Sequence, residues 1–97
     1  MTGFSDETRD QIWQRAGGLC EARCAPQCRI WGFWCHHRLL RRHGNHSTVN
    51  GLLVCTPCHQ LIHTAGRAAY DAGLLVRSWA NPADIPVTPG LFTKGTP

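Results

Sequence analysis

The sequence predicts one small α+β domain that needs bound metal for part of its stability. Its 97 residues suffice for a single domain with a thin core, because a fold of this size buries only about 60–65% of its unfolded surface. Short apolar stretches at 31–35 and 52–54 are typical of strands, and helical stretches stand before and after them. Six cysteines in a chain with ten glycines and six prolines supply thiolates that can staple such a loop-rich fold.

The first element is a helix over 5–16. Ser5 is a suitable N-cap, the first turn is acidic, and Gly17 with Gly18 ends the helix. Ile12, Trp13 and Ala16 form the face that we expect to be buried.

The middle of the chain predicts two strands joined by a loop. The aromatic stretch WGFWC at 31–35 leads directly into His36 and His37. Residues 38–49 are polar and basic and predict a loop, and the second strand follows at 52–54.

A second helix follows the second strand. Thr56 is a good N-cap and Pro57 suits the first helical position, so we expect a helix that runs to about Ala65. A short helix over 67–72 and a short strand over 74–76 come next.

The domain organisation follows from these elements. We expect an N-terminal helix in 1–18, the functional domain in 19–78 and a Pro/Gly-rich C-terminal tail in 79–97, all within one domain.

The charge of the chain favours a polyanionic partner. Ten Lys and Arg against six Asp and Glu give a formal charge of +4 and a pI near 9.0. Arg38, Arg41 and Arg42 crowd directly after the histidine pair. The chain has no recognisable secretory signal and no apolar run of the roughly 20 residues that span a bilayer, so we expect a soluble, cytoplasmic protein without a membrane partner.

The cysteines predict a tetrahedral thiolate site. Cys55 and Cys58 have the spacing of two zinc ligands at a strand-to-helix turn. The other two ligands come from one segment, which holds Cys20, Cys24 and Cys28. The spacing alone does not choose among the three possible pairs. Cys35, inside the aromatic strand, is expected to be a buried apolar thiol.

The histidines predict a second metal site. His59 and His63 are four residues apart on one helical face and can reach the same ion. Neighbouring side chains on a strand point to opposite faces, so one of His36 and His37 can bind that ion while the other faces elsewhere. For His43 and His46, in the loop, the sequence leaves two interpretations open: contacts to phosphate, or no particular role.

Three motifs together resemble a known family. CHHR at 35–38, Asn50 and CTPCHQLIH at 55–63 resemble the motif of the HNH nucleases. CEAR at 20–23 and AYDAGLLVRSWANPADIPV at 69–87 are similar to small HNH proteins of actinobacterial phages. The resemblance implies a ββα-metal finger, in which two strands and a helix surround one divalent ion beside a four-cysteine zinc. It also favours Cys20 and Cys28 as the partners of Cys55 and Cys58, with Cys24 as an alternate ligand.

The resemblance assigns a role to each motif residue. His36, His59 and His63 would bind the catalytic ion, His37 would be the general base, and Asn50 would brace the loop and orient His37. The chain departs from the family pattern in its extra cysteine, Cys24, and in Trp34, where some relatives carry an acidic residue.

The expected function is therefore hydrolysis of DNA phosphodiester bonds with low sequence specificity. Zinc would be the structural ion, and the catalytic ion would be Mn²⁺, Ni²⁺, Co²⁺, Zn²⁺ or Mg²⁺, of which three histidines suit Mg²⁺ least. Arg38, Arg41 and Arg42 would hold DNA phosphates, contacts that carry no base information. The phage resemblance implies products with 5′-phosphate and 3′-hydroxyl ends, adds phage packaging proteins as candidate partners, and suggests the cytoplasm of a bacterial host as the location.

Two alternatives explain part of the same pattern. A non-catalytic zinc-ribbon module, for DNA binding or as an adaptor, accounts for the cysteines and the basic charge but leaves the histidine pair and the position of Asn50 unexplained. A secreted disulfide-rich protein accounts only for the number of cysteines.

Overall fold

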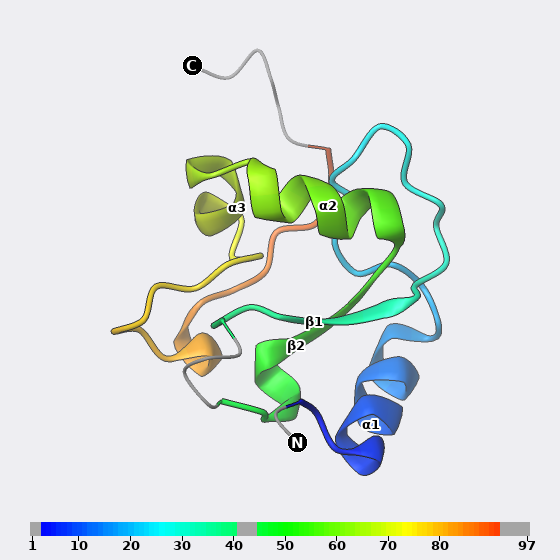
Figure 1. The fold of residues 1–97 in the computed structure, drawn as a ribbon, viewed down its shortest axis with the longest axis vertical. Helices are drawn as coiled ribbons and strands as arrows, with labels where there is room; N and C mark the ends of the chain where they lie inside the picture. Colours follow the sequence, from blue (N-terminus) through cyan, green and yellow to red (C-terminus); the bar gives the residue numbers. More distant parts are fainter. Residues whose placement is uncertain (1–2, 41–44, 92–97) are drawn as a thin grey trace.

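The computed structural model describes residues 3–40 and 45–91. In this part of the chain a two-stranded antiparallel sheet lies between an N-terminal helix and a helix that follows the sheet (Figure 1). The elements, in chain order, are α1 (Asp6–Ala16), β1 (Trp34–His37), η2 (Thr48–Asn50), β2 (Gly51–Val54), α2 (Thr56–Thr64), α3 (Arg67–Asp71) and η3 (Pro82–Asp84), where η marks a single 3₁₀ turn.

Both ends of α1 form as the sequence predicts. Ser5 is the N-cap, and its hydroxyl accepts a 3.1 Å hydrogen bond from the backbone N–H of Thr8. Gly17 ends the helix in the left-handed region, with φ of 64°. The helix buries Ile12 against Phe4 and Leu53 in a small apolar cluster on one face of the sheet, and Ala16 packs against that cluster. Trp13 is 49% exposed, so the prediction that it belongs to the buried face is wrong.

The sheet pairs β1 with β2 so that Trp34 lies opposite Val54 and His37 lies opposite Gly51. The first strand begins at Trp34, three residues after the predicted start at residue 31, because Gly32 does not pair with β2. A Cβ on Gly32 would lie 2.2 Å from Cγ of Leu53, so only a glycine lets the backbone pack this closely against the core.

The helix α2 begins one residue earlier than the capping prediction. Cys55 is the N-cap residue, with extended backbone angles, so Thr56 and Pro57 are the first two helical residues. The hydroxyl of Thr56 instead accepts a 2.9 Å hydrogen bond from Nε1 of Trp34. The prediction that Thr56 caps the helix is wrong, while Thr64 ends the helix within one residue of the predicted end.

The predicted strand at 74–76 is wrong, since these residues form no strand in the described chain. They cross the edge of the sheet through single contacts: the N–H of Val76 donates to the carbonyl of Arg38 over 2.9 Å, and the carbonyl of Leu74 contacts His36. Leu74 itself is fully buried. The apolar residues at 74–76 led to the prediction of a strand, but they are buried in the core and are not part of a β-ladder.

The segment after residue 79 packs against the rest of the fold. The N–H of Thr88 donates to the carbonyl of Ala72 over 2.8 Å, and the N–H of Gly90 donates to the carbonyl of Ala22 over 2.9 Å. Gly73 adopts φ of 76°, and a Cβ there would lie 2.0 Å from the backbone oxygen of Pro86. The larger apolar cluster extends from the cysteines through β2 and α2 to Leu74.

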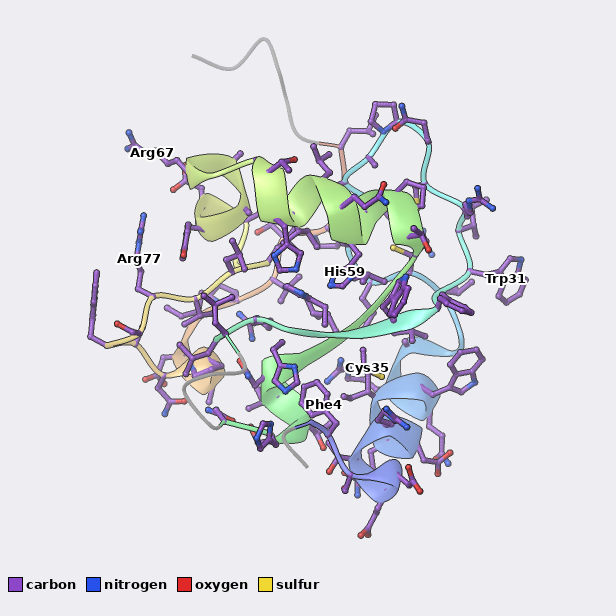
Figure 2. The ribbon with its side chains drawn as sticks, viewed as in Figure 1. Phe4, Trp31, Cys35, His59, Arg67 and Arg77 are labelled. Carbon is purple, nitrogen blue, oxygen red and sulfur yellow. The ribbon has the colours of Figure 1, made fainter. Side chains whose placement is uncertain are left out.

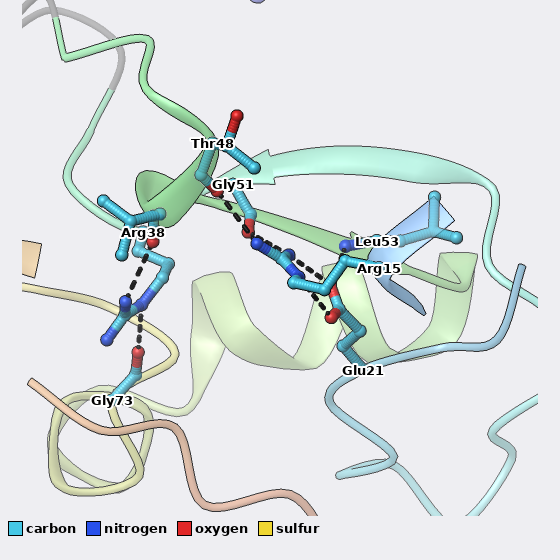
Figure 3. A network of polar contacts seen from close by, with 8 residues as sticks. Arg15, Glu21, Arg38, Thr48, Gly51, Leu53 and Gly73 are labelled. Carbon is cyan, nitrogen blue, oxygen red and sulfur yellow. Dashed lines mark hydrogen bonds and ion pairs between the residues drawn. The ribbon is translucent and has the colours of Figure 1, made fainter. Parts of the chain in front are cut away.

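A polar network fastens α1 to the hairpin (Figure 3). The guanidinium of Arg15 donates to both carboxylate oxygens of Glu21, over 2.9 and 2.6 Å, and to the backbone oxygens of Thr48 and Gly51 over 3.0 and 2.7 Å. The same carboxylate accepts a 2.9 Å bond from the N–H of Leu53. The helix is thus tied to the backbone of the sheet as well as to its core.

None of the helices formed by residues 3–40 and 45–91 is both long and apolar enough to cross a membrane.

Candidate metal centres and a histidine pair

Four cysteines converge at the start of α2. The sulfur atoms of Cys20, Cys28, Cys55 and Cys58 all lie within 4.8 Å of one another. All but Cys28 are buried. A compact group of four thiols is the ligand set of a structural zinc, so this group can hold a zinc ion.

Cys24 lies beside this four-cysteine group without belonging to it. Its thiol is buried and points to the carbonyl oxygen of Cys58, 3.9 Å away. Burial raises the pKa of the Cys24 thiol. Of the three pairs that spacing left open, the structure thus groups Cys20 and Cys28 with the other two ligands.

Cys35 is also outside the four-cysteine group. It is half-buried and packs against the cluster that contains Leu53. Burial raises its pKa, in keeping with an apolar thiol.

Backbone amides surround the sulfur atoms and favour the thiolate state that a metal requires. The N–H of Arg29 points to the sulfur of Cys55 over 3.4 Å, and the N–H of Ala25 points to that of Cys58 over 3.5 Å. Burial alone would raise the pKa of Cys55, but hydrogen bonds from the amides of Arg29 and Cys58 and from neighbouring thiols lower it to about 7. Burial raises the pKa of Cys58, so Cys55 is the first of the two to lose its proton.

Three histidines form a second group, between β1 and α2. The ligand nitrogens of His36, His59 and His63 all lie within 4.8 Å of one another, and Nε2 of His59 is 3.2 Å from Nε2 of His63. Figure 2 shows His59 between α2 and β1. His36 is buried and His63 is exposed, so the group reaches from the core to the surface. Together the three imidazoles can hold a divalent ion.

The buried ligand His36 is oriented from behind. Its Nε2 lies 2.8 Å from the carbonyl oxygen of Leu74, which fixes Nε2 as the protonated nitrogen and leaves Nδ1 for a metal. Burial lowers the pKa of His36 to about 3. The pKa of His59 is also lowered, first by burial and then by the charge of His63. At neutral pH both rings are therefore neutral, as a metal ligand must be.

His37 faces the other side of the sheet, as strand alternation predicts. Its ring stacks on that of Phe4, with 3.8 Å between the ring centroids and 10° between the planes. Its Nε2 lies 3.0 Å from Nδ1 of His46. The two adjacent histidines of β1 thus belong to two separate groups.

His46 is the residue of this site that the sequence analysis missed. It lies in a polar loop where no periodicity relates it to the strand, so no local signal indicates its contact with His37. The only hint in the sequence is Asn50, which we expected to hold that loop in place.

Asn50 braces the loop as expected. It is fully buried; its Oδ1 accepts a 2.7 Å bond from the N–H of Leu39, and its Nδ2 donates to the carbonyls of Leu39 and Asn45 over 3.1 and 2.7 Å. One side chain therefore joins the two described ends of the loop, and its backbone oxygen also accepts from the N–H of Arg38, the residue after His37.

The expectation that Arg38 holds DNA phosphates is wrong. Its side chain is buried, and its guanidinium donates to four backbone carbonyls, those of Val49, Gly73, Pro82 and Ile85. Hydrogen bonds inside the fold occupy the donors that a phosphate would need. Arg41 and Arg42, the other two predicted phosphate ligands, and His43 lie outside the described residues.

Comparisons with protein-family models, with curated proteins and with solved structures found no match. What the structure establishes is a small α+β fold with a two-stranded antiparallel sheet and a group of four cysteines that can bind zinc.

Proposed function

We propose that the protein is a metal-dependent DNA endonuclease of the HNH type, with low sequence specificity. The observation that carries the proposal is the division of two adjacent histidines between two groups. His36 joins His59 and His63 in a set of metal ligands, while His37 is held by Phe4 and His46 outside that set. A metal ion that only stabilised the fold could use the group of His36, His59 and His63, but it would not require His37 to be held in a fixed orientation outside that group.

The distribution of charge supports a nucleic acid as the substrate. Residues 22–70 contain six arginines and no Asp or Glu, although they include every candidate ligand except Cys20. Among the described residues of this stretch, Arg23, Arg29 and Arg67 are exposed. A surface free of carboxylates does not repel the phosphates of DNA, and contacts to phosphates give affinity without base information.

The four-cysteine group has a positioning role in this proposal. Cys55 and Cys58 stand at the first turn of α2, and His59 follows directly. A zinc ion bound there fixes that turn, and with it the place of His59 opposite His36. The structural ion and the catalytic ion would thus be coupled through Cys58 and His59, which are adjacent in α2.

His37 is the proposed general base. A neutral imidazole accepts a proton from water, and its reach is fixed here by the stacking on Phe4. The contact between Nε2 of His37 and Nδ1 of His46 couples the tautomers of the two rings, because one nitrogen must donate and the other accept.

When bound, the divalent ion supplies Lewis-acid stabilisation of the charge that develops on the phosphate and leaving oxygens. His36, His59 and His63 would hold it, and this ligand set suits Mn²⁺, Ni²⁺, Co²⁺ or Zn²⁺ better than Mg²⁺. The proposal requires one phosphodiester to reach both histidine groups across β1. DNA is the proposed partner, in the cytoplasm of a bacterial host, with phage packaging proteins as further candidates on the resemblance alone.

Replacing His37 tests the proposal. His37→Ala should lower the rate of plasmid cleavage by about 10²- to 10⁴-fold, because it removes a general base, while zinc content, binding of the second ion and DNA binding stay near those of the wild type. His59→Ala is the matched variant: it should also weaken binding of the second ion. Cleavage is measured after chelation and after adding back Mn²⁺, Ni²⁺, Co²⁺, Zn²⁺ or Mg²⁺.

Two outcomes would contradict the proposal. Wild-type protein that cuts no DNA with any of these ions is not a nuclease, and the non-catalytic zinc module then accounts for the chain. If His37→Ala loses the second ion, His37 is a ligand and not the base.

A further inference from the structure

Three aromatic side chains are exposed just before and at the start of β1. Trp31 is 65% exposed, Phe33 is 72% exposed and Trp34 is 44% exposed. Figure 2 shows Trp31 projecting away from the ribbon. We call these three residues the aromatic platform. Large apolar side chains gathered at one surface are uncommon in a soluble domain and indicate a binding surface.

The backbone of the aromatic platform is fixed while its side chains face outward. The N–H of Gly32 donates to the carbonyl of Gly18 over 2.9 Å, and the N–H of Phe33 donates to the carbonyl of Val54 over 2.8 Å. Gly32 is buried against Leu53. The segment contributes its backbone to the core and exposes its aromatic side chains, an arrangement that fold stability alone does not explain.

The aromatic platform adjoins the three-histidine group. The ring of Trp34 lies 5.7 Å from that of His59, with 32° between the planes, and its indole N–H is held by Thr56. A ligand at the histidine group that extends along β1 toward the N-terminal end of this strand therefore meets Trp34 first, and Phe33 next to it, 5.1 Å from the Trp34 ring.

The surrounding charge decides which ligand fits. Arg29, two residues before Trp31, is exposed, and the nearest acidic residue in the sequence before Trp31 is Glu21, whose carboxylate is bound to Arg15. Exposed aromatic rings in a stretch of chain that carries arginines and no carboxylates have the composition of surfaces on which single-stranded nucleic acids stack their bases.

We propose that the aromatic platform stacks unpaired bases of DNA, so that the protein acts beside single-stranded segments such as overhangs, gaps and junctions. The inference rests on the proposed function, because it assumes that DNA reaches the three-histidine group. In a blunt duplex the faces of the bases are covered by their neighbours, and only a strand with unpaired bases offers them. Each stacked base is expected to add about 5- to 150-fold to the affinity.

The test measures binding to three labelled oligonucleotides in the absence of a cleaving ion: a single strand, a blunt duplex, and a duplex with a single-stranded overhang. The protein is the full chain with its structural zinc, and fluorescence anisotropy gives each Kd. The variant is Trp31→Ala with Phe33→Ala. The matched control is Trp79→Ala, since Trp79 is 82% exposed and follows Arg77, which lies on the side of the molecule opposite Trp31 (Figure 2).

The wild type should bind the single strand and the overhang at least 5-fold tighter than the blunt duplex. The double variant should lose this preference and keep its duplex affinity, and the Trp79→Ala control should behave as the wild type. A 2-aminopurine in the single strand should lose fluorescence on the wild type and retain it on the double variant, because stacking quenches it.

An unchanged preference in the double variant would overturn the inference, as would an equal loss for all three oligonucleotides. Self-association of the wild type that the double variant lacks, with unchanged DNA binding, would make the aromatic platform an interface between copies and also overturn it. Binding is measured without cleavage, so the two proposals fail separately: a protein that stacks single strands and cuts none would refute the proposed function, and only the stacking of bases on the aromatic platform would stand.

Discussion

At the scale of single residues, Arg38 shows that a charged side chain in a basic run can have a purely internal role. Its guanidinium crosslinks the end of β1 to Gly73 and to the η3 segment through backbone carbonyls. Burial lowers the pKa of this guanidinium, but its ordinary value is so high that it stays charged. The charge is tolerated inside the fold because the guanidinium donates to four backbone carbonyl oxygens, which replace the hydrogen bonds that it would make to water.

Replacing Arg38 should therefore act on stability. Arg38→Ala is expected to lower the free energy of unfolding by about 3–5 kcal/mol, since it leaves several buried carbonyls without a partner. Arg67→Ala is the control, because Arg67 is exposed and its ion pair with Asp71 is 3.7 Å long; about 0.5 kcal/mol or less is expected there. Denaturant unfolding of the zinc-loaded proteins gives both values. A stable Arg38→Ala variant with weakened DNA binding would return Arg38 to the phosphate role.

At the scale of elements, the four-cysteine group connects the irregular segment before β1 to the first turn of α2. These two parts of the chain are otherwise held by backbone hydrogen bonds, such as that from the N–H of Glu21 to the carbonyl of Leu53 over 2.7 Å, and by Ala22 and Ala25 in the larger apolar cluster. A bound structural zinc contributes on the order of 10–16 kcal/mol of apparent binding energy, more than a core of this size supplies.

Cys55→Ser should therefore lose both zinc and the folded state, whereas Cys24→Ser should keep them. The two variants change equally buried thiols, and only the first thiol belongs to the four-cysteine group. Metal analysis and circular dichroism measure the outcome. A folded, zinc-free Cys55→Ser, or loss of zinc from Cys24→Ser, would contradict the ligand assignment.

The elements that the sequence predicts correctly are those with local causes. Ser5 and Gly17 define α1 through their own capping geometry, and the four-residue spacing of His59 and His63 requires only a helix. The strand at 74–76 was predicted from apolar composition, which describes buried residues equally well when no partner strand is present.

The candidate site could likewise be predicted from the sequence only where its causes are local. Strand alternation separates His36 from His37 without any knowledge of the fold. The choice of Cys28 over Cys24 depends instead on the path of the loop, in which Arg23 takes φ of 49°, and spacing does not encode this. The contact of His46 with His37 depends in turn on how the loop closes, which a single sequence does not state.

At the scale of the whole molecule, the neutral buried His36 makes stability depend on pH. Its pKa is about 3 in the fold and near its ordinary value of 6.5 in the unfolded chain. Well above pH 6.5 His36 is unprotonated in both the folded and the unfolded state, so its protonation does not lower the free energy of unfolding. As the pH falls from 6.5 toward 3, only the unfolded state takes up the proton, and stability falls by up to about 1.4 kcal/mol per pH unit.

The expected comparison is between wild type and His36→Gln, without added divalent ion, from pH 7 to pH 5. The variant retains a donor for Leu74 but does not titrate, so its unfolding free energy should fall less steeply than that of the wild type. Weakening of the zinc site by acid is common to both proteins and cancels in the difference. Parallel curves would mean that His36 is not buried as a neutral ring.

The bonds of Arg15 have a consequence for how the sequence can vary. Two of its acceptors are the backbone oxygens of Thr48 and Gly51, and Glu21 likewise receives the backbone N–H of Leu53 (Figure 3). Every amino acid carries a backbone oxygen, so replacement at Thr48 leaves this bond in place, whereas no other side chain reproduces the planar set of donors of Arg15. Tolerance to mutation is therefore one-sided: Thr48, which enters the network through its backbone oxygen, is free to change, whereas Arg15 and Glu21, which enter it through their side chains, are not.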